Sequence, residues 1–168
     1  MKKIGCLMTV FTLVLMYICG CANNERLKKV DLHQPFSGEA AIHQSWQGDY
    51  LLDLLHRLPE DQRQQSVGFI GDAETFKAVW KAFEPAEAVP DIDFKTNLVL
   101  FARNTQFYNR IRIGKVNVTN GVAEVLAMET MSAMPIEDKV AMSMVVVGRQ
   151  GITAIQSNDK IIQINKTK

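Results

Sequence analysis

The hydrophobic pattern of this 168-residue chain changes its period at Pro90. Before Pro90, apolar residues recur at helical spacing over 49–58 and 73–83, whereas after it they alternate as in half-buried strands. A segment with one of these periods does not bury its apolar face in the other conformation. The pattern therefore predicts an α+β fold in which two N-terminal helices pack on a mostly antiparallel sheet of about six strands.

Both expected helices follow an acidic residue that is able to cap the first turn. Asp49 precedes a leucine-rich face that Pro59 ends, and Asp72 precedes an aromatic face over 73–83. The short apolar run 67–70 between the helices suits a buried strand. We expect the aromatic face to pack in the core rather than to hold a cofactor.

Turn sequences divide the region of strand period. Asn120-Gly121 predicts a type I′ hairpin turn, and Gly114 is the expected position of a bulge because the apolar residues on its two sides differ in parity. The run 140–147 is apolar at both parities, which predicts a central strand covered on both faces. The expected strands are 97–102, 108–119, 122–128, 140–147, 152–156 and 160–164.

The N-terminus carries an export pattern. Lys2 and Lys3 follow Met1, an uncharged and mostly apolar run comes next, and a small residue precedes Cys21. This pattern resembles the signal peptide of bacterial lipoproteins. The resemblance implies that residues 1–20 are removed and that a lipid on the Cys21 thiol anchors the protein in the cell envelope. Because Ala22 rather than Asp follows the cysteine, it also implies the outer membrane, on the side facing the periplasm. Cleavage after Ala22 and an uncleaved signal anchor are the alternatives.

The remaining chain divides into a tether and one domain. Residues 21–44 are polar and lack an apolar period, so we expect a flexible tether before a single α+β domain over 45–168. The alternative is that 40–46 already pack on the domain. All three cysteines lie within the first 21 residues, so the domain has no disulfide. Without the two N-terminal lysines, the chain has one fewer basic than acidic side chain. This charge excludes an electrostatic argument for nucleic-acid binding.

Few residues have a spacing that indicates catalysis. None of His33, His43 and His56 has a partner at metal-ligand spacing. Ser157 and Lys160 have the spacing of an S-x-x-K motif, but they fall in an expected hairpin turn rather than on a helix. The sequence therefore predicts a protein that is not an enzyme. An unrecognised hydrolase, which needs a histidine or a carboxylate pair in a pocket, is the remaining catalytic alternative.

The methionines beyond the signal segment are clustered. Met128, Met131 and Met134 form M-x-x-M-x-x-M, and thioethers are ligands that favour Cu(I). A periplasmic copper-binding protein is therefore the alternative function. Met142 and Met144, in the expected central strand, are interpreted as core residues. In the main interpretation the protein has no metal and no cofactor other than the lipid on Cys21.

One region has a family resemblance. The strand 67–70, the helix with Phe76 and Trp80, and the turn Pro90-Asp91-Ile92-Asp93-Phe94 before the strand at 97 resemble the PrcB-like domain, from about residue 67 onward. Gln106-Phe107-Tyr108 stands where that family has a Gly-Gly-Tyr-like segment. The family is named after an accessory, non-catalytic subunit of a protease complex, and relatives occur in exported lipoproteins. The resemblance implies a binding or accessory role and supplies no catalytic residue.

We expect partner contacts in two loops. Arginines and exposed aromatic residues are favoured at protein interfaces, as are adaptable methionines. The alternative for Phe107 and Tyr108 is burial under the sheet. The candidate contact residues are Arg103, Phe107, Tyr108 and Arg110 in the loop 103–110, and Met131 and Met134 in the loop 129–137.

Overall fold

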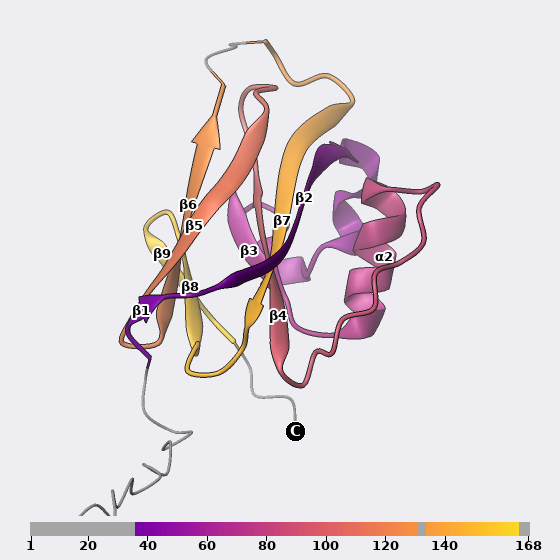
Figure 1. Cartoon of the computed structure of the whole chain (residues 1–168). Coiled ribbons are helices and arrows are strands. Elements are labelled where there is room, and N and C mark those ends of the chain that lie inside the picture. Colours follow the sequence, from indigo (N-terminus) through magenta and orange to yellow (C-terminus); the bar gives the residue numbers. More distant parts are fainter. Residues whose placement is uncertain (1–35, 131–133, 165–168) are drawn as a thin grey trace, which may run out of the picture. The chain divides into compact units, whose positions relative to one another are not determined.

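The computed structural model describes residues 36–130 and 134–164 (Figure 1). The expected signal peptide, Cys21, the tether up to residue 35, and Met131 lie outside the described residues. None of the described helices is long and apolar enough to cross a membrane. The elements are β1 (Gly38–Glu39), β2 (Ile42–Leu51), the 3₁₀ helices η1 (Leu52–Arg57) and η2 (Glu60–Gln62), β3 (Val67–Ile70), α2 (Ala73–Phe83), β4 (Asn97–Arg103), β5 (Ile111–Thr119), β6 (Val122–Glu129), β7 (Lys139–Gly148), β8 (Ala154–Ser157) and β9 (Lys160–Gln163).

The strands form two sheets, with α2 beside one of them (Figure 1). Sheet A has the strand order β1-β5-β6-β8-β9, and sheet B has the order β2-β7-β4-β3. All neighbouring strands are antiparallel except β6 and β8, which are parallel. One face of sheet B packs on sheet A and the other on α2, so the domain has three layers and two apolar cores.

Strand β7 separates the two cores. Successive side chains point to opposite faces of a strand, so Met142 and Met144 pack in the core on the side of α2, whereas Ala141 and Val145 pack against sheet A. All four side chains are buried. The prediction of a central strand covered on both faces is confirmed, and so is the interpretation of its methionines as core residues.

Helix α2 has the expected bounds. Asp72 caps it, because its carboxylate accepts a hydrogen bond of 2.8 Å from the N–H of Thr75. Phe76 and Trp80 face sheet B and are buried. Both rings contact Trp46 of β2, and the Trp46 and Trp80 rings meet edge to face at 5.1 Å between centroids. The aromatic face is therefore a core face, as predicted.

The predicted fold class is wrong, because the segment 49–58 is not an α-helix. Its first three residues end β2, and Leu52–Arg57 form the 3₁₀ helix η1 without a side-chain cap. Tyr50 is buried on the side of α2 and pairs with Val140. The pairing of β2 with β7 therefore continues into the segment whose apolar residues have helical spacing. Among the described residues α2 is the only helix of seven residues or more. The domain is mainly β, with two packed sheets rather than two helices on one sheet.

The expected boundary of the tether is also corrected. Residues 38–39 and 42–44, which were assigned to the tether, lie in β1 and β2. Ala40 and Ile42 pack against the core between the sheets, which supports the alternative that this segment belongs to the domain. Phe36 is already attached, since its N–H donates to the carbonyl of Gly151 at 3.3 Å and its carbonyl accepts from the N–H of Gly121 at 3.0 Å.

The predicted turns are confirmed. Asn120 and Gly121 have φ angles of 50° and 81°, as a type I′ turn requires. The register of β5 against β6 shifts between Ile113 and Lys115, which places the bulge at Gly114. Strand β5 begins three residues later than predicted, because the segment that precedes it forms a loop with contacts of its own.

Candidate functional site

The two loops that were expected to bind a partner lie side by side. We call 103–110 and 129–137 together the loop pair. The N–H of Tyr108 donates to the carbonyl of Met134 at 2.8 Å, and Phe107 forms an isolated bridge with Pro135. Between Arg110 and Thr130, hydrogen bonds of 3.0 Å run in both directions, one of them to the threonine hydroxyl. Backbone hydrogen bonds therefore fix the described parts of the two loops against each other.

Large apolar side chains are exposed on and beside the loop pair. The side chain of Phe107 is 47% exposed and that of Met134 is 56% exposed. Met128, near the end of β6, is 64% exposed. Phe107 is therefore not buried under the sheet, whereas Tyr108 is half-buried.

Arg103 lies inside the domain, which corrects the expectation that it is an exposed contact residue. It is 4% exposed, and its guanidinium donates to the carbonyls of Arg63 and Asn104. Burial lowers the pKa of Arg103, and the nearby Tyr50 partly opposes this effect. Its role is to donate hydrogen bonds to backbone carbonyls just after η2 and just after β4.

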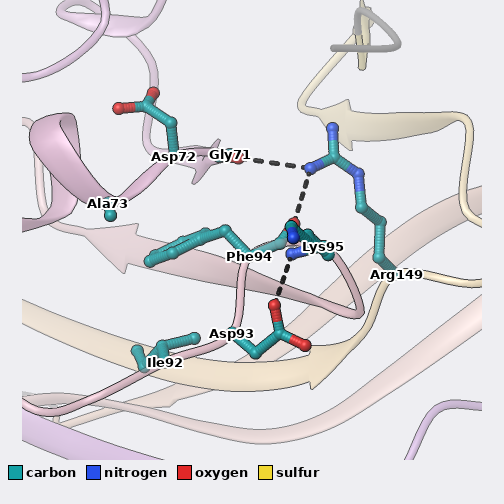
Figure 2. A pocket seen from close by; sticks show the side chains of 8 residues that line it. All are labelled: Gly71, Asp72, Ala73, Ile92, Asp93, Phe94, Lys95 and Arg149. Atoms are coloured by element: carbon teal, nitrogen blue, oxygen red, sulfur yellow. Dashed lines mark hydrogen bonds between the residues drawn. The ribbon is translucent and has the colours of Figure 1, made fainter.

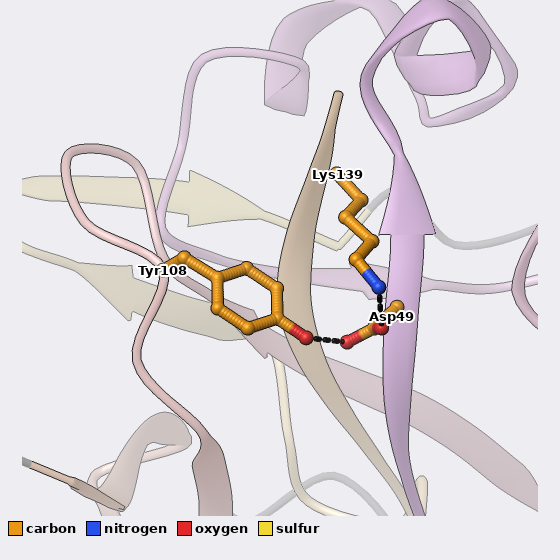
Figure 3. Close-up of polar contacts among 3 residues, drawn as sticks. All are labelled: Asp49, Tyr108 and Lys139. Atoms are coloured by element: carbon orange, nitrogen blue, oxygen red, sulfur yellow. Dashed lines mark hydrogen bonds and ion pairs between the residues drawn. The ribbon is translucent and has the colours of Figure 1, made fainter. Parts of the chain in front are cut away.

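Tyr108 belongs to a polar cluster with Asp49 and Lys139 (Figure 3). Its hydroxyl donates to one carboxylate oxygen of Asp49, and the ammonium of Lys139 donates to the other at 2.8 Å. The same ammonium lies 5.6 Å from the centre of the Tyr108 ring. The cluster thus attaches the loop 103–110 to β2 and to the start of β7.

The protonation states of this cluster are set by its hydrogen bonds. Burial raises the pKa of Asp49, but hydrogen bonds from Lys139 and Tyr108 outweigh it, so this pKa lies below its usual range. The bond to Asp49 raises the pKa of Tyr108 and also that of Lys139. Both groups therefore keep their protons at neutral pH and do not act there as a nucleophile or a base.

A polar slot of about 320 Å³ lies beside this cluster. It opens between β2, an edge strand of sheet B, and the start of β5 in sheet A. Of the predicted contact residues, Tyr108 and Arg110 line this slot. The full lining is Gln47, Gly48, Asp49, Tyr108, Arg110, Ile111 and Ala141. Sequence reasoning missed Asp49 and Lys139, because they lie 59 and 90 positions from their partners along the chain.

A larger hollow of about 590 Å³ lies at the N-terminus of α2 (Figure 2). Arg149 donates from Nη1 to the carbonyls of Gly71 and Phe94 at 3.2 and 3.1 Å. Asp72 caps the helix, and Asp93 accepts hydrogen bonds from Lys95 and Thr96. The Thr96 bond, together with the Lys95 N–H, holds the pKa of Asp93 below its usual range. Arg149 therefore joins the segment after β7 to Gly71, which follows β3, and to the 91–96 turn.

The residues considered for catalysis or metal binding are not brought together in the described part of the chain. No group of three or more histidine, cysteine or acidic residues within 36–130 and 134–164 is arranged to hold a metal ion. Ser157 is buried at the end of β8 and pairs with Lys160 across a hairpin turn, as the sequence predicts. His56 contacts its own helix through Asp53, and His33 lies outside the described residues. The copper site stays a prediction, because Met131 is not described.

Comparison with protein-family models, with curated proteins and with solved structures finds no match for this chain. The resemblance to the PrcB-like domain and the resemblance of the N-terminus to a lipoprotein signal therefore stay predictions.

Proposed function

We propose that the protein is a non-catalytic binding module of the bacterial cell envelope. A lipid on Cys21 anchors it, and the loop pair contacts another envelope protein. The proposal rests on the export pattern before Cys21 and on the exposed apolar side chains of the loop pair. The PrcB-like resemblance, which implies an accessory role, agrees with it.

The observation that carries the proposal is the position of Phe107 and Met134. Both are largely exposed on loops whose backbones are hydrogen-bonded to each other at Tyr108 and Met134. Exposed aromatic and thioether groups lose contact with water when a partner covers them. Loops that are already fixed lose little conformational entropy on binding. The described parts of the loop pair, residues 103–110, 129–130 and 134–137, therefore have the composition and the preorganisation of a contact surface.

Crosslinking in cells tests this proposal. We compare the full-length lipidated protein with the double variant Phe107→Ser, Met134→Ser. The matched control is Ile161→Ser, which removes an exposed side chain of similar size from β9. The wild type and the control are expected to crosslink one protein stoichiometrically, and the double variant is expected to lose it. Equal crosslinking by all three proteins contradicts the proposal. A Cys21→Ala variant reports whether the contact needs the anchor.

Copper binding is the second candidate, favoured by the exposure of Met128 and Met134. Thioethers bind Cu(I), and replacing methionine by leucine keeps the bulk of the side chain. Exchange of Met128, Met131 and Met134 for leucine is expected to abolish Cu(I) binding in a competition titration. Unchanged affinity in this variant eliminates the copper site.

A further inference from the structure

Strand β2 leaves part of its backbone unpaired. The N–H of Leu52 donates to the carbonyl of Asp138 at 2.9 Å, so these two residues form a hydrogen-bonded pair. Hydrogen-bonded and non-hydrogen-bonded pairs alternate along an antiparallel ladder, so the residues of β2 that bond β7 are those at even positions. Gln47 and Asp49 therefore turn their backbone N–H and C=O groups toward the open edge. No described residue pairs with these groups.

Strand β5 is also unpaired where it borders the slot. The N–H of Thr130 donates to the carbonyl of Arg110, so by the same alternation Ile111 turns its backbone groups away from β6. On that side of β5, the register of β1 covers only Asn117 and Val118. The slot thus has unpaired backbone donors and acceptors on both of its long sides.

Hydrogen bonds close the slot at both ends. At one end Ser143 Oγ accepts from the N–H of Ile113 and donates to the carbonyl of Trp46, both at 3.2 Å, which joins β5 to β2. At the other end Tyr108 donates to Asp49 (Figure 3). Gln47 and Gly48 lie between these bridges on β2, and the bridged residues Trp46 and Asp49 are about 10 Å apart along the strand. An extended chain cannot pass through a slot of this kind, whereas the end of a chain can enter it.

Arg110 gives the slot its charge. Its guanidinium has no ion pair or side-chain hydrogen bond with any residue in the described part of the chain. Arg110 lines the slot together with Asp49 and Tyr108, and its charge acts on both of them, so it lies near the end that the Tyr108–Asp49 bond closes. The carboxylate of Asp49 is already balanced by Lys139. Among the residues that line the slot, Arg110 is thus the cationic group left to pair with an anionic ligand.

We propose that the slot binds the free C-terminus of a partner polypeptide. The last two or three residues add as a short strand to the open edge of β2, and the terminal carboxylate pairs with Arg110. Both parts of this mode are known ways of recognising peptides, by strand addition and by capture of a terminal carboxylate. The inference deepens the proposed function and rests on it, because it names the part of a partner protein that the domain recognises.

Amide NMR of the full-length protein in mild detergent tests the inference. The probe is acetyl-Gly-Val-Val with a free carboxyl end, compared with the same peptide ending in an amide. The acid is expected to shift the amide signals of Gln47, Asp49 and Ile111, with an affinity at least about tenfold higher than that of the amide, because a charge-assisted hydrogen bond to arginine is lost in the amide. Arg110→Gln is expected to remove this difference. Arg112→Gln is the matched control, since Arg112 is an exposed arginine two positions further along the chain, in β5, and does not line the slot.

Three outcomes overturn the inference. The first is equal affinity of the protein for the acid and the amide peptide. The second is an equal loss of affinity for the acid peptide in Arg110→Gln and Arg112→Gln. The third is no shift of the amide signals of the slot residues up to about 10 mM peptide. The titration reports on the slot alone. If it fails while Phe107→Ser, Met134→Ser still loses its crosslinked protein, only the mode of recognition is wrong. If the titration succeeds and that crosslink is unaffected, the slot rather than the loop pair is the contact surface.

Discussion

The hydroxyl of Tyr108 donates a hydrogen bond to the carboxylate of Asp49, which lies 59 positions earlier in the chain. This single contact attaches the loop before β5 to the edge strand of the other sheet. Lys139 bonds the second carboxylate oxygen at 2.8 Å, so that both oxygens of Asp49 are occupied. The attachment depends on the negative charge of Asp49, which makes it sensitive to acid.

We expect the free energy of unfolding to fall on acidification, because Asp49 becomes protonated. Its pKa in the folded protein lies below the value of 3.8 that it has when unfolded, so its contribution is fully present above about pH 5. The contribution is lost as the pH falls below 3.8 through the lower pKa of the folded state. Asp49→Asn should therefore reduce the free energy of unfolding at pH 7 by at most about 1 kcal/mol, because the carboxylate is partly exposed to solvent, and should have almost no effect at pH 2.

Urea unfolding of the detergent-solubilised protein at pH 7 and pH 2 measures this difference. Asp91→Asn, which removes a carboxylate from the loop before β4, is the control for the general effect of charge. An Asp49→Asn effect of the same size at both pH values would show that packing, rather than ionisation, is responsible.

Arg103 is predicted to stabilise the fold rather than to bind a partner. Arg103→Ala leaves the partly buried carbonyl of Arg63 without the donor that Arg103 supplies, and it removes the packing of a long buried side chain. We therefore expect the free energy of unfolding to fall by about 2–3 kcal/mol. Arg110→Ala, at an exposed position, should change the free energy of unfolding by less than about 0.5 kcal/mol. Denaturant unfolding of both variants measures these values. The reverse order of the two losses would be inconsistent with the placement of Arg103.

Gly68 is predicted to tolerate no side chain. A Cβ at this position would lie far inside van der Waals contact with Gln62 Oε1 and with the ring of Phe101. Gln62 is buried and uses this oxygen to accept the N–H of Phe69 at 2.6 Å, so it cannot move away without losing a hydrogen bond. Gly68→Ala should destabilise the protein by about 2–3 kcal/mol, or prevent folding. Gly71→Ala, which has room for a methyl group, is the matched control in thermal unfolding.

The packing of β2 against α2 has a spectroscopic signature. Trp46 and Trp80 are the two tryptophans of the chain, and their rings meet at 5.1 Å in an edge-to-face arrangement. Indole groups at this distance couple electronically, so the circular dichroism spectrum should contain a pair of far-ultraviolet bands of opposite sign. Trp46→Phe should remove the pair while unfolding stays cooperative. If the pair of bands persisted in Trp46→Phe, it would come from groups other than the two coupled tryptophans.

The sequence predicted best the elements whose signals are local. The bounds of α2 follow from the cap at Asp72 and from the aromatic spacing, and the hairpin turn follows from the positive φ angles that Asn120 and Gly121 accept. Strand β2 was missed because Leu51 and the leucines after it have helical spacing. The conformation of residues 49–51 is decided by pairing with β7, a contact that spans more than 80 residues and leaves no local pattern.

The candidate site was predicted only in part. Loops rich in aromatic residues and methionine indicated the loop pair, and Phe107 and Met134 are exposed as a contact surface requires. Arg103 was misplaced because an arginine at the end of a strand gives no sign of which carbonyls surround it. The slot was invisible to sequence reasoning, since it arises where the edges of two different sheets separate.

The position of Phe36 gives the domain an orientation. Its bonds to Gly121 and Gly151 hold the start of the described chain at the end of sheet A where β5 finishes, whereas Arg110 lies just before β5 begins (Figure 1). The nine residues of β5 separate the two ends by about 30 Å. The chain therefore enters the described domain at the end opposite to the slot, so a ligand bound in the slot and the segment before Phe36 act on opposite ends of sheet A.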